Sequence, residues 1–398
     1  MKSQECQEVP KIKVYVGMSG GVDSSVSALL LKQAGYDVTG VFIKVWQPDW
    51  ITCNWKEERI EAMRAAAHIG IPFVTLDLVQ EYKTEVIDYM IAEYKAGRTP
   101  NPDVMCNREV KFGAFWRWAY AQGADFVATG HYARVEKHAL DSLPSGRASK
   151  PAGFVLCSRR RAAQCPSVNK SSACFDLLTG IDANKDQSYF LWTLNQNDLE
   201  HIMFPIGHLT KPEVRALAKK HKLPNAEKKD SQGLCFIGKI DVKEFLSHYI
   251  HTEKGNVLNE KGEIIGTHEG ALLLTIGERH GFTITKKTPH DTPYYILRKD
   301  IANNTIIVGQ KISETRSSAT GTQKINLERV NWTGLIPAIG SKLQARTRYR
   351  QPLQGITILS INEDTVVVEC EHVQDVVAPG QSLVIYNGEQ CIGGGIIS

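Results

Sequence analysis

Hydrophobic residues follow two alternating spacings over the first third of the chain. Short apolar runs with strand character occur at four places, and each leads into a segment whose apolar residues recur at helical spacing. The predicted strands are Ile12–Val16, Val38–Ile43, Pro72–Leu76 and Asp125–Thr129, and the predicted helices are Ser24–Ala34, Lys56–Ile69, Glu81–Tyr94 and Val110–Gln122. Strands that alternate with helices are typical of a parallel sheet with helices on both faces. Because ligands bind such sheets beyond the carboxyl ends of the strands, we expect the loops after Val16, Ile43 and Thr129 to share one site.

The pattern breaks after this region and later becomes β-rich. Residues 136–172 are rich in Ser, Pro, Ala, Arg and Lys, and we expect a surface insertion there, with a short strand at Phe154–Cys157. From about residue 255 onward, short β-rich runs alternate with Gly and Asn turns, and the end of the chain predicts a small antiparallel barrel. Between these regions, helical spacing returns at Asn197–Phe204, Lys211–Lys222 and Val242–His248.

The length of 398 residues fits two or three domains. We expect an α/β protein whose N-terminal, Rossmann-like domain spans residues 1–240 and carries the insertion at 136–172. A small central β-rich domain would follow over 241–315, and a C-terminal antiparallel β-barrel over 316–398.

The composition is that of an ordinary soluble protein, with 42% hydrophobic and 23% charged residues. The net charge of +4 is too small to establish nucleic-acid binding by itself. No apolar run approaches the roughly 20 residues of a membrane helix, and the polar segment Met1–Lys11 lacks a signal-peptide core, so we expect a cytoplasmic protein without membrane contact. The nine cysteines are scattered and odd in number, which argues against a secreted disulfide framework, and the absence of a Cys-x-x-Cys pair argues against a metal site.

Candidate chemistry begins where the first predicted strand ends, at residues 19–25, which read Ser-Gly-Gly-Val-Asp-Ser-Ser. Glycines let backbone amides approach an anion, and the helix that follows directs its positive end to the same place. The lysine of a Walker loop and the third glycine of a dinucleotide fingerprint are both missing. The run resembles the PP-loop of ATP pyrophosphatases, which cut ATP between the α and β phosphates and leave AMP on a substrate oxygen.

Two cysteines lie in segments that can support sulfur chemistry. Cys106 closes a run that reads Asn-Pro-Asp-Val-Met-Cys, just before the predicted helix at Val110, and we expect the helix N-terminus and nearby basic residues to lower its pKa. Asp103 in the same run is placed to take or hold a proton. Cys235 lies in a glycine-bounded run, Gly-Leu-Cys-Phe, that follows two lysines. Considered separately, the Cys106 segment fits a buried packing cysteine as well as it fits a reactive one. The Cys235 segment fits a packing cysteine better than a reactive one.

The combination of motifs resembles the bacterial tRNA-specific 2-thiouridylases, the MnmA/TrmU family, over nearly the whole chain apart from the insertion. Besides the phosphate loop and the two cysteine segments, the shared motifs are Thr129-Gly130-His131-Tyr132, Lys185-Asp186-Gln187-Ser188-Tyr189-Phe190 and Arg346-Thr347-Arg348-Tyr349-Arg350. The family replaces the 2-oxygen of the wobble uridine in certain tRNAs with sulfur. The resemblance therefore implies a sulfurtransferase that uses ATP and Mg²⁺ and takes glutamate, glutamine and lysine tRNAs as substrates.

The resemblance also implies roles for individual residues. The ATP-binding positions would be Gly17, Met18, Ser19, Gly20, Gly21, Val22, Asp23, Ser24, Ile43 and Gly130, and Ile43 stands where the family often has Met. The implied nucleophile is Cys106, and Asp103 is the acid/base candidate. A sulfur-carrier protein would deliver a persulfide to Cys235. Sulfide would then be released with a transient Cys106–Cys235 disulfide, or the persulfide would attack the base directly.

Further residues of the family pattern would contact RNA. The target base would lie against Asn101, Pro102 and Asp103, because a base must leave its stack to be modified. The implied tRNA contacts are His131, Lys185, Asp186, Gln187, Arg348, Tyr349 and Gln381. Read without the resemblance, His131 is as often a structural histidine, and the alternating Arg346–Arg350 run fits one solvated strand face.

Three other functions compete with this hypothesis. A PP-loop synthetase that forms amides on a small molecule needs neither the cysteine pair nor an RNA-binding barrel, and its cysteine-to-serine variants would keep full turnover. A lysidine or 4-thiouridine enzyme would not need the separate motif around Cys235. A tRNA-binding protein without catalysis would fail to consume ATP when tRNA is present.

Overall fold

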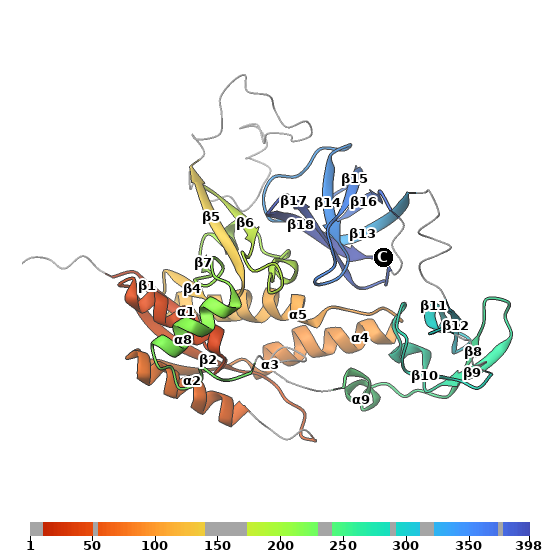
Figure 1. Ribbon diagram of the computed structural model, residues 1–398, viewed down its shortest axis with the longest axis horizontal. Coiled ribbons are helices and arrows are strands. Elements are labelled where there is room, and N and C mark those ends of the chain that lie inside the picture. The colour runs from red at the N-terminus through yellow and green to blue at the C-terminus, as the bar shows by residue number, and fades with distance from the viewer. Residues whose placement is uncertain are drawn as a thin grey trace, which may run out of the picture.

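The computed structural model describes residues 11–50, 55–139, 173–229, 241–286, 292–310, 322–372 and 377–398. Its elements form a helix-rich N-terminal region, a β-barrel above the long helices of that region, and a small β-rich unit at the far end from the N-terminal sheet (Figure 1). The expected order of an α/β domain, a central β-rich unit and a C-terminal barrel is confirmed. The predicted strand at Phe154–Cys157 lies outside the described residues.

The N-terminal sheet is parallel and has the strand order β3-β2-β1-β4-β7. Its strands are β1 (Lys13–Gly17), β2 (Asp37–Lys44), β3 (Phe73–Asp77), β4 (Phe126–Ala128) and β7 (Ile202–Met203). The first four confirm the predicted strands. The predicted helix Asn197–Phe204 is wrong in its second half, because α7 (Gln196–Leu199) ends early and Ile202 pairs with Val127 as an edge strand. Pairing with a neighbouring strand overrides the local helical spacing.

Helices pack around this sheet and confirm the other predicted helical segments. The first two are α1 (Val22–Gln33) and α2 (Trp55–Ile69). One continuous run comprises α3 (Val79–Tyr82), η1 (Lys83–Asp88) and α4 (Tyr89–Lys95), and a second comprises α5 (Pro102–Met105), η2 (Cys106–Ala114) and α6 (Phe115–Ala121). In both runs the η segment is a π-helix. Later helices are α8 (Lys211–Lys220) and α9 (Val242–Ser247), with short 3₁₀ turns at Ser188–Phe190 and Ala271–Leu273.

The C-terminal barrel closes through pairing of β13 with β18 and has the order β13-β16-β15-β14-β17-β18. Its strands are β13 (Gln323–Trp332), β14 (Lys342–Arg346), β15 (Gln354–Ile361), β16 (Thr365–Cys370), β17 (Ser382–Asn387) and β18 (Gln390–Ile397). Two strands from the N-terminal region extend this sheet. They are β5 (Ala133–Ala139) and β6 (Ala173–Thr179), which form an antiparallel pair. The insertion expected over 136–172 is wrong for residues 136–139, because these pair with β6 as part of β5.

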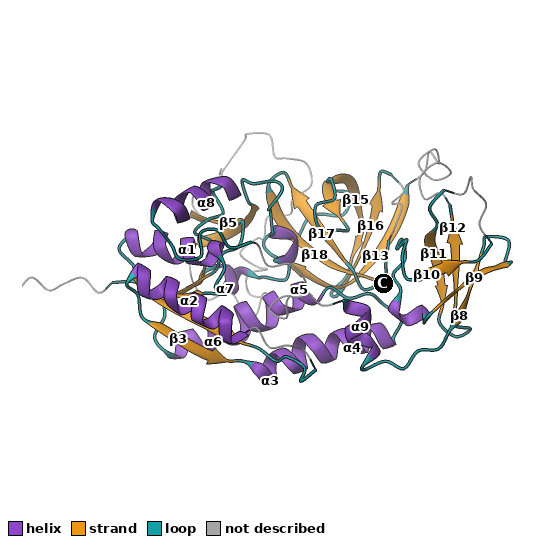
Figure 2. Cartoon of the chain, turned by 60° about the horizontal axis from the view of Figure 1, so that its bottom comes forward, coloured by secondary structure: helices purple, strands orange, loops and turns teal. Residues whose placement is uncertain are grey.

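The central unit is a five-stranded sheet with its own small apolar core. Its strand order is β10-β9-β8-β12-β11, in which β12 and β8 run parallel (Figure 2). The strands are β8 (Gly255–Leu258), β9 (Ile264–His268), β10 (Phe282–Ile284), β11 (Tyr295–Asp300) and β12 (Thr305–Gly309).

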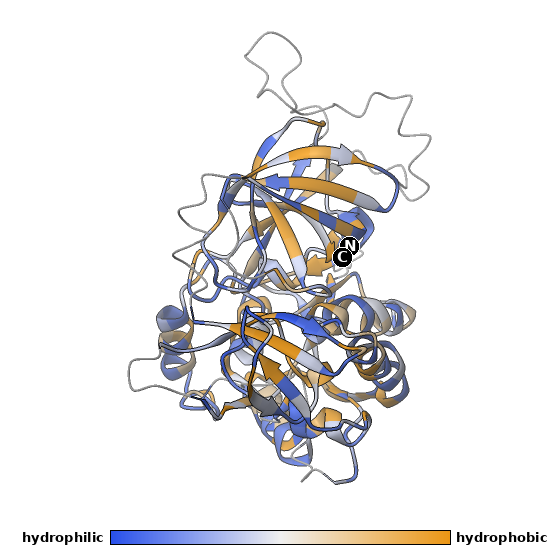
Figure 3. Cartoon of the chain, turned by 90° about the vertical axis from the view of Figure 1, so that its right-hand side faces the viewer, coloured by the Kyte–Doolittle hydropathy of each residue, from blue (hydrophilic) through white to orange (hydrophobic). Residues whose placement is uncertain are grey.

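The largest hydrophobic cluster crosses the boundary between the N-terminal region and the barrel. It joins residues of the long helical runs, such as Tyr82 and Cys106, to Val384 and Tyr386 of β17. Hydrophobic stretches alternate with hydrophilic ones along the strands of the barrel (Figure 3). The barrel is therefore packed onto the N-terminal region rather than tethered to it. Within the described part of the chain, no helix is long and apolar enough to cross a membrane.

Candidate active site

The phosphate loop lies between β1 and α1, as the sequence predicts. Gly20 adopts a φ of +77°, and a Cβ there would lie 2.6 Å from the carbonyl oxygen of Glu58, so only glycine fits without strain. A Cβ on Gly130 would lie 2.7 Å from the amide nitrogen of Ser24. The loop after β4 therefore packs against the start of α1, which confirms that the loops after β1 and β4 lie together.

Two amides of the loop make only long bonds within the loop. The amide of Ser19 donates to Ser24 Oγ at 3.3 Å, and the amide of Gly21 donates to Ser19 Oγ at 3.4 Å. Bonds of this length lie beyond the usual range and break easily. The hydroxyls of Ser19 and Ser24 can therefore turn to a phosphate, and the amides become donors for it.

Asn225 fixes the opposite side of the loop. Its Nδ2 donates to the carbonyl oxygens of Gly20 at 2.9 Å and Gly21 at 3.1 Å, and it lies 2.9 Å from Ser25 Oγ. Asn225 is 6% exposed, so these bonds are shielded from water. Carbonyls held on one side of a tight loop leave its amides directed to the other side, where an anion can bind.

Asp23 is held by two side chains from other segments. Lys211 Nζ donates to its two carboxylate oxygens at 2.7 and 2.9 Å, and the hydroxyl of Tyr132 donates to Oδ1 at 2.9 Å. Lys211 is 8% exposed, so its ammonium is a nearly buried positive charge beside the phosphate loop. The sequence reasoning missed Lys211 and Asn225, because each lies about 200 residues from the loop along the chain.

Cys106 lies inside a helical run rather than before one. Asn101 caps α5 by accepting from the amide of Val104 at 3.4 Å, and Pro102 occupies the first turn. The helix thus starts earlier than the predicted Val110, and the expectation of a thiol at a helix N-terminus is wrong. The amide of Cys106 is already bonded to the carbonyls of Pro102 and Asp103. The positive end of the helix is at Pro102, closer to Asp103 than to the thiol.

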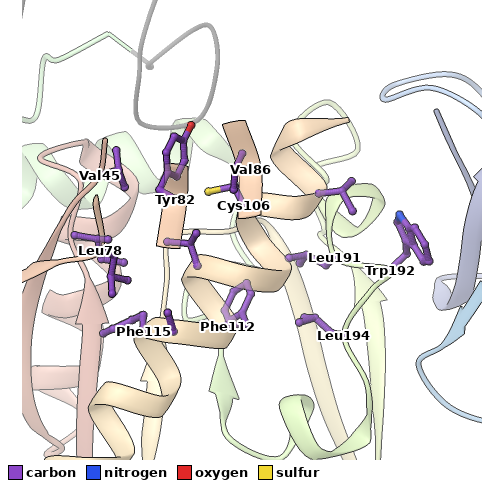
Figure 4. Close-up of a cluster of buried hydrophobic side chains, with 14 of the residues drawn as sticks. Val45, Leu78, Tyr82, Val86, Cys106, Phe112, Phe115, Leu191, Trp192 and Leu194 are labelled. Atoms are coloured by element: carbon purple, nitrogen blue, oxygen red, sulfur yellow. The ribbon is translucent and has the colours of Figure 1, made fainter. Parts of the chain in front are cut away.

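The side chain of Cys106 is fully buried, at the point where α5 passes into the π-helix η2. Figure 4 shows it among Tyr82, Val86 and Leu191. Ile43, a predicted ATP-binding residue, belongs to the same hydrophobic cluster. The helical run thus places the thiol of Cys106 in the hydrophobic core that packs against the N-terminal sheet. Cys235, the second cysteine of the hypothesis, lies outside the described residues.

His131 is a buried neutral histidine. Its Nδ1 lies 2.7 Å from the hydroxyl of Thr129, and its ring packs against Phe112 and Phe204. Burial holds the pKa of His131 well below its usual value, and the positive charge of Lys111 lowers it further. A charged interaction with phosphate is therefore disfavoured for this ring in this conformation.

The structure separates the predicted tRNA contacts into exposed groups and groups bonded within the protein. Arg348 is exposed, and Tyr349 is half-buried against Phe190, with ring centroids 4.8 Å apart. Asp186 is 4% exposed, and its carboxylate accepts from two backbone amides, from the hydroxyl of Ser188 and from Arg346.

Two glutamines of the predicted tRNA set also bond to the protein backbone. The side-chain oxygen of Gln187 accepts from the amide of Tyr132 at 3.0 Å. The side-chain nitrogen of Gln381 donates to the carbonyls of Thr99 and Pro100. The roles of these residues toward tRNA stay predictions.

Comparison with known proteins matches three families in succession along the chain. The models are described as tRNA methyl transferase HUP domain over residues 12–239, tRNA methyl transferase PRC-barrel domain over 243–310, and aminomethyltransferase beta-barrel domain over 322–397.

Relatives match over nearly the whole length. The tRNA-specific 2-thiouridylase MnmA of Lacticaseibacillus paracasei is 41% identical over 97% of this chain and 94% of its own. The enzyme of the same name from Shewanella amazonensis is 42% identical over 97% and 94%. Among solved structures, the U34-tRNA thiolase NcsA from Methanococcus maripaludis covers 60% of this chain and 63% of its own at 17% identity and a TM-score of 0.32, which is too distant to inform the site.

Proposed function

This chain belongs to the MnmA family of tRNA-specific 2-thiouridylases, and we therefore propose that it replaces the 2-oxygen of the wobble uridine of tRNA with sulfur at the expense of ATP. The observation that carries the proposal is the phosphate loop at residues 19–25. Asn225 fixes the carbonyls of Gly20 and Gly21, while the amides of Ser19 and Gly21 have only long bonds to serine hydroxyls. Such a loop fits an ATP-consuming enzyme better than a passive tRNA-binding protein.

The first step would activate the uridine oxygen. A carbonyl oxygen is a poor leaving group, and its attack on the α-phosphorus of ATP releases pyrophosphate and leaves AMP on the oxygen. The amides of the loop and the hydroxyls of Ser19 and Ser24 would hold the pyrophosphate as its charge develops. The wider ATP-binding set would be Gly17, Met18, Ser19, Gly20, Gly21, Val22, Asp23, Ser24, Ile43 and Gly130.

Mg²⁺ would screen the charge of the phosphates when it is bound. The described part of the chain contains no cluster of three His, Cys, Asp or Glu side chains that would form a protein cage for it. Mg²⁺ is commonly held by substrate phosphates together with one or two carboxylates. Asp23, the carboxylate of the loop, already pairs with Lys211 and Tyr132, so the phosphates of ATP would be the main ligands of Mg²⁺.

The second step would introduce sulfur from a persulfide on Cys235, delivered by a sulfur-carrier protein. In one route the thiolate of Cys106 attacks the inner sulfur of the persulfide and releases sulfide, which adds to C2 of the base. In the other route the outer sulfur adds to C2, and Cys106 then breaks the S–S bond. In both routes AMP leaves with the original oxygen, and an external thiol reduces the Cys106–Cys235 disulfide. Because Cys106 is buried, both routes require its Sγ to become accessible when tRNA binds.

The proposed substrate contacts follow the same family pattern. Asn101, Pro102 and Asp103 would surround the target base, with Asp103 as the acid/base group. Of the predicted tRNA contacts, Lys185 and Arg348 supply the positive charge that phosphates attract. The remaining members of the set are His131, Asp186, Gln187, Tyr349 and Gln381. The expected substrates are glutamate, glutamine and lysine tRNAs.

Trapping of the activated tRNA tests this order of steps. A Cys106→Ser variant, given ATP labelled at the α-phosphate and unmodified glutamate tRNA, should release pyrophosphate and attach labelled AMP to the tRNA without forming thiouridine. The same tRNA with cytidine at the wobble position is the control and should stay unlabelled. If the variant thiolates tRNA at the wild-type rate, Cys106 is not the nucleophile and the proposed chemistry is wrong.

A further inference from the structure

The backbone at residues 130–132 connects the phosphate loop to the segment at 180–187, which carries three of the predicted tRNA contacts. On one side, a Cβ on Gly130 would lie 2.7 Å from a backbone nitrogen at the start of α1. On the other side, a Cβ on Gly180 would lie 2.6 Å from the carbonyl oxygen of Tyr132. Neither glycine leaves room for a side chain, so residues 130–132 pack directly against the backbone of both segments.

Tyr132 is bonded to both of the segments that this connection joins. Its hydroxyl donates to Oδ1 of Asp23 in the phosphate loop at 2.9 Å. At its backbone, the amide donates to the side-chain oxygen of Gln187 at 3.0 Å, and the carbonyl accepts from the amide of Gln187 at 2.9 Å. The side chain is 2% exposed, so close packing holds its ring in place. A shift of the backbone at Tyr132 is therefore carried through the ring to Asp23.

The second partner of Asp23 is fixed to the same segment. Lys211 Nζ donates to both carboxylate oxygens of Asp23, and the backbone amide of Lys211 donates to Oδ2 of Asp182 at 2.9 Å. The backbone carbonyl of Asp182 accepts in turn from the amides of Lys185 at 2.9 Å and Asp186 at 2.7 Å. Both side chains that hold Asp23 are thus bonded to the stretch of chain that carries the predicted tRNA contacts.

We propose that Tyr132 is a positioning residue that couples the two substrates of the reaction. Contact of tRNA with Gln187, or with His131 beside Tyr132, moves the backbone at Tyr132 and realigns Asp23 for ATP. The inference rests on the proposed function, which assigns Gln187 and His131 to tRNA and Asp23 to ATP. Because Tyr132 is buried, it acts on ATP through Asp23 rather than by contact. Such coupling suits the chemistry, since the oxygen that receives AMP belongs to tRNA.

The coupling has a measurable thermodynamic consequence. If tRNA changes the affinity of the enzyme for ATP by some factor, ATP must change the affinity for tRNA by the same factor. We call this ratio of dissociation constants the coupling factor. A tyrosine that only stabilised the phosphate loop would affect ATP binding equally with and without tRNA, and its loss would leave the coupling factor unchanged. The coupling factor therefore separates a positioning role of Tyr132 from a structural one.

The coupling factor is measured in the full-length enzyme with Mg²⁺, unmodified glutamate tRNA and an ATP analogue. In the analogue a methylene group replaces the oxygen between the α and β phosphates, so the bond that the enzyme would cut stays intact. Titration calorimetry gives the dissociation constant of the analogue without and with saturating tRNA, and that of tRNA without and with saturating analogue.

Two variants are compared with the wild type. Tyr132→Phe removes only the hydroxyl that bonds to Asp23 and keeps the buried ring. Tyr120→Phe is the matched control, because Tyr120 on α6 is 67% exposed. Thermal unfolding of each variant checks that its fold is intact.

In the wild type, each ligand should lower the dissociation constant of the other by the same factor, at least about fivefold. Tyr132→Phe should reduce this coupling factor by about threefold or more, because a hydrogen bond to a charged carboxylate is lost. Tyr120→Phe should have the coupling factor of the wild type.

A Tyr132→Phe enzyme with the wild-type coupling factor would overturn the proposal, even if it bound the analogue more weakly. A wild-type enzyme that binds both ligands without coupling would overturn it as well. Both results leave the proposed function intact. A wild-type enzyme that does not bind the tRNA contradicts the proposed function and, with it, this inference.

Discussion

Asn225 shapes the phosphate loop from a segment that follows α8. It contributes the bonds that fix the carbonyls of Gly20 and Gly21, and its own Oδ1 is buried without a partner among the described residues. A half-satisfied amide in this place is retained at a cost in stability, since an unpaired buried acceptor costs about 1–3 kcal/mol. That cost is consistent with a requirement for the amide at the loop.

Replacing Asn225 by Ala should loosen the phosphate loop. We expect the KM for ATP to rise and the free energy of unfolding to fall by about 1–3 kcal/mol, because two buried carbonyls lose their donor. Steady-state assays of AMP release and chemical unfolding measure the two quantities. Asn326→Ala, at an exposed position on β13, is the control and should change neither. An Asn225→Ala enzyme with unaltered KM for ATP would contradict the role assigned to this side chain.

At the residue scale, the sequence predicts the chemistry of short motifs well, but it predicts poorly which other residues surround those motifs in the fold. The glycines of the phosphate loop adopt the tight turn expected of them, because the constraint is local. The predicted position of Cys106, before its helix, is wrong. The helix begins at Pro102 after the Asn101 cap, whereas its apolar residues show helical spacing only from Val110 onward. Lys211 and Asn225 reach the loop only after folding, and no local pattern marks them.

The β5–β6 pair shows how an element accommodates the expected insertion. The two strands stay in register from Ala133↔Thr179 to Ala139↔Ala173, so the ends that flank residues 140–172 are direct partners. A two-residue turn can join strand ends in this arrangement. The pair also bonds to β18 through Leu177 and Leu178, and its position in the barrel sheet does not depend on the intervening chain.

Replacing residues 140–172 by Asn-Gly should therefore preserve both the fold and the chemistry. We expect the thiolation rate to stay within about twofold of the wild type, because Asn-Gly forms the turn that a two-residue hairpin needs. The measurements are the circular dichroism spectrum and the single-turnover rate. A folded variant that has lost thiolation would show that the insertion takes part in the reaction.

At the element scale, long periodic segments are predicted well and short ones are not. The helices over 56–69 and 211–222 have complete apolar faces, and the structure confirms them to within two residues at each end. The segment after Asn197 is too short to form a stable helix of its own, and strand pairing with β4 decides its second half. The π-helical stretch in η2 has no signal in the apolar spacing.

For the whole molecule, a buried ion pair joins the barrel to the N-terminal region. Arg346 at the end of β14 donates to Asp186 at 2.5 Å and to the hydroxyl of Tyr386 at 2.8 Å, and the two charged side chains are 8% and 5% exposed. Breaking one partner of such a pair leaves an uncompensated charge in the interior. The pair therefore holds the segment at 185–190, which belongs to the N-terminal region, against strands β14 and β17 of the barrel.

Substitution of either charge should destabilise the protein strongly. We expect Asp186→Leu or Arg346→Met to lower the free energy of unfolding by about 3–5 kcal/mol, and the double variant to lose less than the sum. Glu269→Ala, which breaks the exposed pair with Lys254, is the control and should cost less than about 1 kcal/mol. A single variant as stable as this control would contradict the structural role of the pair.

The order of the three units was predictable from the change in hydrophobic spacing along the chain. Strand and helix spacings alternate in the N-terminal region, and short β-rich runs dominate from about residue 255 onward. Their mutual packing was not, since the shared core joins residues such as Cys106 and Tyr386 that no local spacing relates.

Mass spectrometry of nucleosides from digested tRNA tests the central claim most directly. Purified protein, ATP, Mg²⁺, a sulfide source and unmodified glutamate, glutamine or lysine tRNA should yield 2-thiouridine at the wobble position, with one oxygen exchanged for sulfur and only when ATP is present. Folded protein that binds these tRNAs, yet produces no sulfur-containing nucleoside at that position with any of them, would contradict the account.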